Sequence, residues 1–492
     1  MRSFAAAVLG AFSLAAPAGV AAGPQPTFQD PPFLQSAGGV LEVTLEAGKA
    51  RVNVGDQRVT SRVYNRTYIP PVFRLMQGDV LRVHQVNNLE SLAINFHSHG
   101  VVTSPRLNGD NVFIVVDPGT EFDTEIPIPL THQSGMYWYH PHVHPYVNQT
   151  LSHGMSSALI IGDILAPFPE LAGITERVMI LKDMKIRNGR PEDDPDPTGK
   201  TLRTINGLLD PIIKIKPGEL QFWRIGNTGA NIFYQLHIPG VTFYQIALDG
   251  NLQNQILELD ELLLPPGTRS EVLVRGPERR GKYKMKTRAF NTGPTGDHYP
   301  SQVMATLLVR GPDVEPIPLP TNFPPLVDLR SQTVDKTRTV MFDDTDDPNV
   351  FVIDNRVWDR DRVDQTVMLG SLEEWTVQNL SQEFHVFHIH QGDFQVTEIN
   401  GIPQPFIGYQ DVVNLPVATD AGPGEVVFRI QFDPPIIVGE YVYHCHIVQH
   451  EDQGMMANAL VQDELALVVQ AAEPPDPIAL ALTPDTGNYW CN

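Results

Sequence analysis

The chain has 492 residues, more than a single hydrophobic core usually serves, so two to four domains are expected. Hydrophobic residues make up 42% of it and charged residues 19%, which is typical of a folded globular protein and argues against a disordered chain. Its 57 acidic and 35 basic residues give a net charge of −22, which argues against binding to nucleic acid or to anionic membrane surfaces.

The N-terminus predicts an export signal. Residues 1–22 contain an early Arg2, a short apolar run rich in alanine, and small residues around Ala21 and Ala22. No other part of the sequence approaches the roughly 18–20 apolar residues of a membrane-spanning helix. We therefore expect an exported protein, periplasmic or extracellular, without membrane insertion. Of the two cysteines, Cys445 lies among histidines and Cys491 is next to the C-terminus, so no disulfide is expected.

Four features recur in the same order three times along the chain. A glycine-containing turn leads into an alternating strand, a Pro-Gly or Gly-rich turn precedes a second strand, a Gly-x-Tyr follows, and a small apolar strand closes the unit. The Gly-x-Tyr begins at Gly135, Gly281 and Gly439. Short β-branched runs between these turns, without a long amphipathic helix, predict an all-β chain. We place three homologous β-sandwich domains at 38–165, 170–312 and 335–472, and a C-terminal tail at 473–492.

Ten of the 16 histidines fall in four tight motifs. In chain order these are NFHSHG with His97 and His99, WYHPHVH with His140 and His142, HVFHIH with His385, His388 and His390, and YHCHIVQH with His444, His446 and His450. The middle repeat carries the lysine-bearing YKMK at the equivalent place. Metal chemistry is therefore expected in the first and third domains.

Strand geometry sorts these residues into two groups, because successive side chains of a strand point to opposite faces. Pairs two residues apart supply eight imidazoles on shared faces, from His97, His99, His140, His142, His388, His390, His444 and His446. Cys445 and His385 fall at odd offsets and face the other way, toward His450 and Met455. Two histidines, a cysteine and a weak axial methionine form the blue-copper ligand set. Imidazoles alone would also suit zinc or nickel, but the adjoining thiolate set selects copper.

These motifs, written HxH, HxH, HxxHxH and HCHxxxHxxxxM, resemble those of three-domain multicopper oxidases of the bacterial laccase-like type. The resemblance covers nearly the whole mature chain and implies three consecutive cupredoxin-like Greek-key domains, each a β-sandwich or barrel, with four copper ions. It assigns the type 1 copper to His385, Cys445, His450 and Met455, the type 2 copper to His97 and His388, and the type 3 pair to His99, His140, His142, His390, His444 and His446. The resulting trinuclear cluster is expected between the first and third domains.

The resemblance also implies the reaction. Four one-electron oxidations of a reductant at the type 1 copper would supply the reduction of dioxygen to two waters at the trinuclear cluster. Electrons would pass from Cys445 through the backbone to His444 and His446, which gives these three residues a catalytic role. The expected reductant is a phenol or another small organic molecule.

Three alternatives bear on that expectation. A metallo-oxidase would take electrons from Fe(II), Mn(II) or Cu(I), although the absence of methionine from residues 391–443 argues against Cu(I). A family member retained as an envelope scaffold would have lost copper ligands, whereas every ligand position here is filled. A copper nitrite reductase would usually have two domains and fewer histidines in each motif.

Several neighbouring residues carry weaker expectations. Asp110, in PRLNGDNVF, matches the place where the family keeps an acid near the cluster, and it could supply protons to dioxygen reduction. Gln449 stands immediately before His450, where related enzymes often carry an acid, and it cannot exchange protons near neutral pH. His144 continues the alternation of His140 and His142 but is expected to be structural. We expect Glu451 and Asp452 to be solvated.

Overall fold

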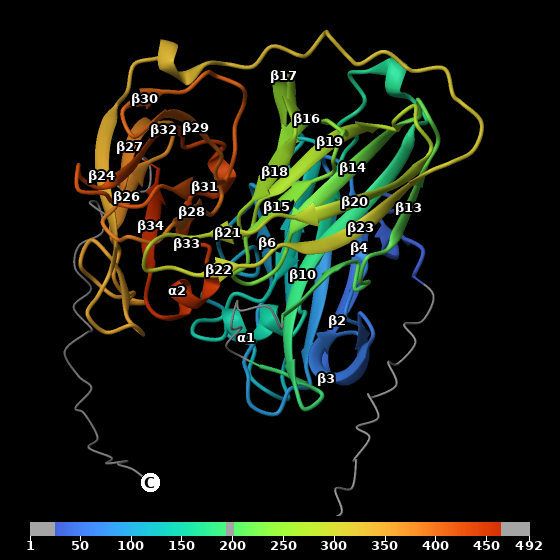
Figure 1. The fold of residues 1–492 in the computed structure, drawn as a ribbon. Helices are drawn as coiled ribbons and strands as arrows, with labels where there is room; N and C mark the ends of the chain where they lie inside the picture. The colour runs from blue at the N-terminus through green and yellow to red at the C-terminus, as the bar shows by residue number, and fades with distance from the viewer. Residues whose placement is uncertain (1–24, 193–200, 464–492) are drawn as a thin grey trace, which may run out of the picture.

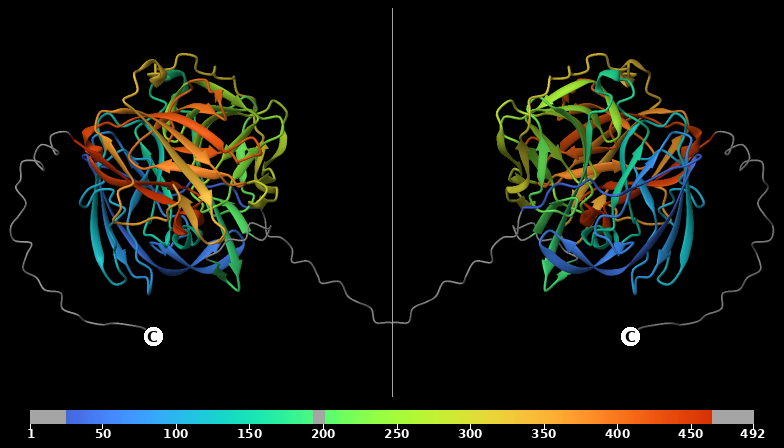
Figure 2. Two further views of the ribbon diagram at one scale, coloured as in Figure 1. Left: turned by 90° about the vertical axis from the view of Figure 1, so that its left-hand side faces the viewer. Right: turned by 90° about the vertical axis from the view of Figure 1, so that its right-hand side faces the viewer.

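The computed structural model of the protein describes residues 25–192 and 201–463. The predicted signal peptide (1–22), the last residues of the predicted third domain (464–472) and the tail (473–492) with Cys491 lie outside the described residues. Within the described ranges, no helix combines the length and apolarity needed to span a membrane. Figure 1 and the side views in Figure 2 show three β-rich segments packed against one another.

The first segment, coloured blue to teal in Figure 1, consists of a four-stranded sheet in the order β3-β2-β5-β7 and a five-stranded sheet in the order β1-β4-β9-β8-β6. Its strands are β1 (Phe33–Gln35), β2 (Val40–Val54), β3 (Gln57–Tyr64), β4 (Val72–Leu75), β5 (Val80–Asn87), β6 (His97–His99), β7 (Glu121–Pro127), β8 (Gly135–His140) and β9 (Ser157–Ile161). A short helix, α1 (Val147–Ser152), lies between β8 and β9, and the 3-10 turn η1 (Pro169–Leu171) leads out of the segment.

The middle segment, green to yellow, has a seven-stranded sheet in the order β11-β10-β14-β19-β16-β17, in which β12 also pairs with β10. It has a five-stranded sheet in the order β13-β23-β20-β15-β18 and the pair β21-β22. The strands are β10 (Thr175–Arg187), β11 (Arg190–Pro191), β12 (Thr201–Ile205), β13 (Ile212–Ile215), β14 (Leu220–Asn227), β15 (Tyr234–His237), β16 (Phe243–Leu248), β17 (Asn251–Leu259), β18 (Glu261–Leu264), β19 (Arg269–Arg275), β20 (Gly281–Thr287), β21 (Phe290–Asn291), β22 (His298–Tyr299) and β23 (Gln302–Val309).

The third segment, orange to red, has a six-stranded sheet in the order β25-β24-β27-β32-β29-β30 and a five-stranded sheet in the order β26-β34-β33-β28-β31. Its strands are β24 (Lys336–Asp344), β25 (Phe351–Ile353), β26 (Gln365–Met368), β27 (Leu372–Asn379), β28 (His385–Ile389), β29 (Phe394–Ile399), β30 (Ile402–Pro403), β31 (Val412–Leu415), β32 (Gly424–Gln431), β33 (Gly439–Cys445) and β34 (Met456–Gln462). The helical elements are η2 (Leu329–Ser331), η3 (Pro435–Ile437) and α2 (Val448–Asp452).

The same strand pairings recur in all three segments. The pairs β2–β5, β10–β14 and β24–β27 are parallel, and the second strand of each pairs antiparallel with β7, β19 or β32. In the other sheet, β8–β9, β20–β23 and β33–β34 are antiparallel. The all-β fold predicted from the repeats is confirmed, as is the cupredoxin-like architecture that the resemblance implies, whereas the predicted domain boundaries stay a prediction.

Period-two patterning explains these sandwiches. Along β2, buried and exposed residues alternate over most of its length, so one face packs inward and the other faces solvent. Two equivalent tryptophans, Trp223 and Trp375, are fully buried, and each indole N–H donates to the side chain two residues earlier, Gln221 or Glu373. The repeated sequence thus reproduces a core contact as well as a topology.

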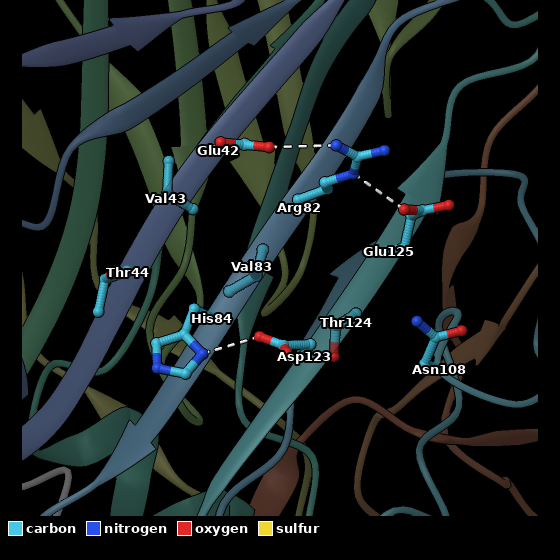
Figure 3. A pocket seen from close by; sticks show the side chains of 10 residues that line it. All are labelled: Glu42, Val43, Thr44, Arg82, Val83, His84, Asn108, Asp123, Thr124 and Glu125. Atoms are coloured by element: carbon cyan, nitrogen blue, oxygen red, sulfur yellow. Dashed lines mark hydrogen bonds and ion pairs between the residues drawn. The ribbon is translucent and has the colours of Figure 1, made fainter.

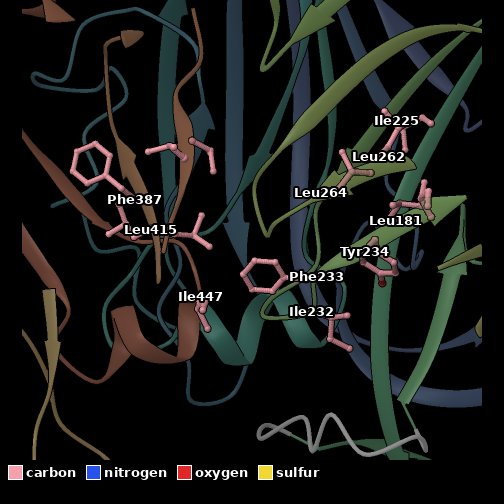
Figure 4. Close-up of a cluster of buried hydrophobic side chains, with 14 of the residues drawn as sticks. Leu181, Ile225, Ile232, Phe233, Tyr234, Leu262, Leu264, Phe387, Leu415 and Ile447 are labelled. Carbon is pink, nitrogen blue, oxygen red and sulfur yellow. The ribbon is translucent and has the colours of Figure 1, made fainter. Parts of the chain in front are cut away.

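One hydrophobic core continues from the middle segment into the third. Phe233 and Tyr234 of the middle segment and Phe387 and Leu415 of the third belong to the same cluster of buried side chains. Figure 4 shows Phe233 between the two groups, with Ile447 nearby at the start of α2. Because burial of such side chains contributes roughly 1.5–3 kcal/mol each, this continuous core fixes α2 relative to the middle segment.

Candidate metal centre

Eight predicted histidines lie in one cluster between the first and third segments. In the first segment β6 pairs with β8, which sets His97 opposite His140, and in the third β28 pairs with β33, which sets His388 opposite His444. The remaining four members of the cluster are His99, His142, His390 and His446. Each of the eight side chains belongs to a residue no more than 2% exposed.

Rings from the two segments interleave. His97 stacks on His390, and His99 stacks on His388, each pair with ring centroids 3.9 Å apart. The Nε2 atom of His444 lies 3.3 Å from the Nε2 atoms of both His142 and His390. On the other side of the cluster, Nε2 of His446 lies 3.2 Å from Nδ1 of His99. Nitrogen atoms therefore converge from both segments.

The chemistry of these nitrogens fits metal ions. Among the described residues, six ring nitrogens of the cluster are buried and without a hydrogen-bond partner: Nε2 of His97, His99, His140 and His388, and Nδ1 of His390 and His446. Buried polar atoms in folded proteins almost always have a hydrogen-bond partner. Six neighbouring nitrogens without one indicate that a bound group, such as a metal ion, is their partner. Burial, reinforced by neighbouring imidazoles, lowers the pKa of His97 and His446 well below the usual range. The rings are therefore neutral and offer lone pairs, as a copper ion requires.

Hydrogen bonds made by Nδ1 orient the rings of three of the histidines. Nδ1 of His388 donates to the carbonyl of Asp411 at 2.8 Å, and Nδ1 of His140 donates to the carbonyl of Pro141 at 2.9 Å. Nδ1 of His444 donates to the carbonyl of Cys445, also at 2.9 Å. These bonds leave the Nε2 atom of each ring facing the cluster, which is the usual way in which proteins orient metal-binding histidines.

A second group forms around Cys445, which lies opposite Phe387 on the paired strands β28 and β33. Its Sγ atom is 3.7 Å from Nδ1 of His385 and 3.8 Å from Nδ1 of His450, and the two nitrogens are 3.2 Å apart. Cys445 and His385 are fully buried and His450 is 6% exposed. Two imidazole nitrogens and one thiol sulfur thus face a common point, and this donor set fits a blue-copper ion.

Local packing fixes the members of this second group. His450 lies on α2, and its ring stacks on Phe351 with centroids 4.0 Å apart. His385 is held through Nε2 by Ser381 Oγ at 3.0 Å, which turns Nδ1 toward the sulfur. Met455 is fully buried, and its carbonyl accepts a hydrogen bond from the Cys445 N–H at 3.0 Å. Its backbone therefore closes the loop that begins at the cysteine.

Asp110 lies directly behind the cluster. Its carboxylate is 3.0 and 3.1 Å from Nδ1 of His97 and accepts the backbone N–H of Ser98 at 3.1 Å and the side-chain amide of Gln391 at 2.9 Å. Burial raises the pKa of Asp110 to about 7. Gln391, which follows His390 with a φ of +59°, also accepts the N–H of Thr103 at 2.8 Å. Asp110 and Gln391 therefore join the two segments; sequence reasoning missed Gln391.

The expectation that Glu451 is solvated is wrong. Its side chain is fully buried, with Oε2 3.2 Å from Nδ1 of His444 and Oε1 3.5 Å from Nε2 of His142. Successive residues of a helix point about 100° apart, so the single turn of α2 directs His450 to the Cys445 group and Glu451 to the histidine cluster. Burial raises the pKa of Glu451 well above its usual range. An acid directly after a predicted ligand was the signal available in the sequence.

Asp452 is half-buried and its carboxylate is hydrogen-bonded, contrary to the same expectation. Its carboxylate accepts the backbone N–H groups of Val147 at 3.2 Å and Asn148 at 2.7 Å, at the start of α1. These are groups that a helix leaves without internal partners. Burial raises the pKa of Asp452 to about 7. The carboxylate therefore ties α2 to the first segment.

Two further predicted positions lie beside the cluster. His144 is half-buried and its ring packs on Trp358 with centroids 4.6 Å apart, a packing contact that agrees with a structural placement. The backbone N–H of Gln449 donates to the side-chain oxygen of Asn231 in the middle segment at 3.1 Å. That contact fixes the start of α2.

A pocket of about 460 Å³ lies on the outer sheet of the first segment and contains none of the predicted site residues. Figure 3 shows its charged side chains paired across β2, β5 and β7. Arg82 bonds to Glu42 at 3.1 Å and to Glu125 at 2.9 Å, and His84 lies 2.7 Å from Asp123. These pairs offset one another on an exposed surface and do not constitute a metal site.

The repeated sandwich fold, the Cys445 group and the eight-histidine cluster define a copper-dependent oxidoreductase. Three multicopper oxidase family models match the chain, at residues 46–164, 137–309 and 324–464. The chain belongs to the multicopper oxidase family.

Individual relatives differ in their described roles. A multicopper oxidase (mco) of Staphylococcus haemolyticus is 25% identical over 86% of this chain and 89% of its own length. A laccase of Bacillus stratosphericus is 26% identical over 73% and 79%, and the cell division protein FtsP of Edwardsiella tarda is 26% identical over 90% and 94%. Among solved structures, a multicopper oxidase from Campylobacter jejuni described as a metallo-oxidase superposes with a TM-score of 0.77 at 25% identity, over 90% of this chain and 96% of the other.

Proposed function

We propose that the protein is a four-copper oxidase that takes single electrons from phenols or other small organic reductants and reduces dioxygen to water. The observation that supports this proposal best is a covalent connection between the two groups of ligands. His444, Cys445 and His446 are consecutive, so one short peptide joins the Cys445 group to the eight-histidine cluster. Electrons collected at the first group therefore have a bonded route to the second.

Each ion has a proposed set of ligands. The type 1 ion would be held by His385, Cys445, His450 and Met455, the type 2 ion by His97 and His388, and the type 3 pair by His99, His140, His142, His390, His444 and His446. Two three-residue groups whose ligand atoms all lie within 4.8 Å of one another match these sets, His385 with Cys445 and His450, and His142 with His390 and His444. When bound, copper would supply reversible one-electron chemistry at the first site and four-electron chemistry toward dioxygen at the second.

The chain's own residues shield the cluster from solvent and supply protons. The histidine cluster is closed to solvent, so a reacting oxygen species would be shielded from side reactions. Each dioxygen that becomes two waters takes up four protons as well as four electrons. Two buried carboxyl groups border the cluster from different sides, Asp110 beside His97 and Glu451 beside His142 and His444. We assign proton transfer to both.

The role of Asp110 can be tested by Asp110→Asn. The amide keeps an oxygen that can accept from His97 and Ser98 but cannot exchange a proton, so dioxygen reduction should slow by about 10- to 100-fold. Reduction of the type 1 ion by substrate should change much less. Stopped-flow measurement of the two half-reactions would separate them, with Asp117→Asn, an exposed aspartate of the same segment, as the control. Equal losses in both half-reactions would make Asp110 a structural residue.

Metal-ion oxidation is the second candidate, and one observation favours it. Asp344 Oδ1 lies 3.2 Å from Nε2 of His385, and the Asp344 side chain is 30% exposed. Glu383 lies close enough for the two carboxylates to interact, and burial raises the pKa of Glu383 to about 7. A carboxylate that contacts both solvent and a type 1 ligand offers a hard cation, Fe(II) or Mn(II), a place beside the electron acceptor. The metallo-oxidase of Campylobacter jejuni supports the same reading.

A substrate panel decides between the two. We expect methoxyphenols to have the highest kcat/KM, since outer-sphere transfer to His450 needs only close approach, with Fe(II), Mn(II) and Cu(I) secondary. Asp344→Asn should then lower oxidation of the metal ions and spare that of phenols, because only cations use the carboxylate. Glu425→Gln, on β32 of the same sheet as Asp344, is the control. A specificity constant for a metal ion well above that for the best phenol would promote the metallo-oxidase.

Similarity to a cell division protein suggests an alternative, non-enzymatic role as a scaffold. The presence of every proposed copper ligand argues against that role. Copper analysis separates the two, since a scaffold needs no copper and the proposed oxidase holds about four ions. An exported location, periplasmic or extracellular, stays a prediction and agrees with a reaction that uses small diffusible reductants and dioxygen.

A further inference from the structure

The middle segment supplies none of the proposed copper ligands, yet it reaches the cluster. The turn before β19 brings Gly267 against the ring of His446, where an added Cβ would lie 3.0 Å from Cδ2. Two residues later, Arg269 begins β19 and is fully buried. We propose that Arg269 is a positioning residue, through which the middle segment holds the histidines of the trinuclear cluster and His388 above all. This inference rests on the ligand sets proposed above.

All five N–H groups of the Arg269 guanidinium have an acceptor. Nε donates to the carbonyl of Met136 at 3.1 Å. Nη1 donates to the carbonyl of Gly267 at 3.2 Å and to Asp411 Oδ1 at 2.7 Å. Nη2 donates to the carbonyl of Asp249 at 2.9 Å and to Asp411 Oδ2 at 2.7 Å. Because these acceptors come from the first, middle and third segments, one side chain holds all three together.

Asp411 transmits this anchoring to the cluster. It lies just before β31, and its carbonyl accepts the Nδ1 hydrogen of His388 at 2.8 Å. Its carboxylate Oδ1 is also 3.4 Å from Nε2 of His99. A residue that bonds to Arg269 through its side chain and to His388 through its backbone fixes the ring that faces the metal. The type 2 ion has only two proposed histidines, so it should depend most on this support.

The turn after His99 is shaped around the same pair. Gly100 has a φ of +81°, and a Cβ there would overlap the guanidinium of Arg269 and the carboxylate of Asp411. Glycine thus serves two needs, a left-handed backbone and room for the ion pair. A buried ion pair is costly unless its hydrogen bonds are complete, and here the guanidinium has every bond it can make.

Arg269→Lys tests the proposal. Lysine keeps the positive charge beside Asp411 but has three donors and no planar fork, so Asp411 and His388 lose their fixed position. In the full-length, copper-loaded protein, we expect the affinity for type 2 copper to fall about 10- to 100-fold while the type 1 ion and its blue colour remain. Copper per chain and the type 1 and type 2 EPR signals would be followed while a chelator is titrated.

A matched control comes from Arg224, another buried arginine of the middle segment, whose partners are Glu176 and Glu271. Glu271 accepts the N–H of Met136 at 3.2 Å, so this arginine supports the same segment junction without a bond to Asp411. Arg224→Lys should therefore keep type 2 copper. Equal losses of type 2 copper in Arg224→Lys and Arg269→Lys, or none in Arg269→Lys, would overturn the inference.

Asp411→Asn provides a second variant in case Arg269→Lys does not fold. It keeps the backbone carbonyl that His388 uses and removes the charge and one of the two acceptor oxygens that pair with Arg269, so the same selective loss of type 2 copper is expected. Retention of type 2 copper at the wild-type level in that variant would also overturn the inference. A wild-type protein that shows type 1 but no type 2 signal would instead contradict the proposed ligand sets themselves.

Discussion

Replacement of Cys445 by serine is expected to abolish the blue colour and the oxidation of every substrate. The thiol sulfur lies 3.7 and 3.8 Å from the nitrogens of His385 and His450, and a hydroxyl there is too hard and too weakly acidic to replace a thiolate on copper. The histidine cluster uses no sulfur, so its proposed ions should remain. Copper content should fall from about four ions per chain to about three.

Absorption in the visible range and copper analysis measure both effects. Cys491→Ser, which replaces the other cysteine of the chain, is the control and should stay blue and active. Thermal unfolding of the copper-free proteins would check that the serine variant is folded, since Cys445 is fully buried in the core. A blue Cys445→Ser protein would refute the type 1 assignment.

Glu451→Gln should have the second-largest effect, on dioxygen reduction. Burial raises the pKa of Glu451, so the folded protein holds its proton at pH values where an exposed glutamate has lost it. That proton lies beside His142 and His444, where it can reach reacting oxygen. Glutamine keeps the shape and cannot exchange a proton, so reoxidation of the reduced protein by dioxygen should slow by about 100-fold or more.

The pH dependence distinguishes this role. A carboxyl that donates its proton works below its pKa and fails above it, so wild-type reoxidation should slow as pH rises. The Glu451→Gln variant should lose the part of that dependence that Glu451 contributes and keep the part that Asp110 contributes. Glu440→Gln is the control, because Glu440 is half-buried on β33, the strand of Cys445. Reoxidation at the wild-type rate in Glu451→Gln would remove Glu451 from the mechanism and leave Asp110 as the assigned donor.

Local patterns in the sequence predict most of the fold. The three repeats specify strands and turns, and each strand's alternation specifies which face is buried, so the paired sheets follow. Histidine spacing separated the Cys445 group from the eight-histidine cluster because strand pairing keeps both sets in register, with His97 opposite His140 and His388 opposite His444.

Contacts between segments that are distant in the chain could not be predicted from the sequence. The burial of Glu451 depends on how α2 packs against α1 and on which residue of a single helical turn faces the histidines, and neither is a property of the local sequence. The network of Arg269 is hidden for the same reason. An isolated Pro-Gly-Thr-Arg turn reads as an ordinary strand start, and only the packed structure brings Asp411 within 2.7 Å of it.

The interleaved histidine rings have a consequence for maturation. His142 and His444 are 302 residues apart in the chain and His99 and His446 are 347 apart. Synthesis from the N-terminus finishes the first pair of motifs long before the last exists, so the cluster can receive copper only after nearly the whole chain has folded. Bound copper would then join the first segment to the third. It would raise the free energy of unfolding by about 2.7 kcal/mol when free metal is 100-fold above its Kd. Without copper, the contact between the first and third segments would be the first part of the structure to weaken.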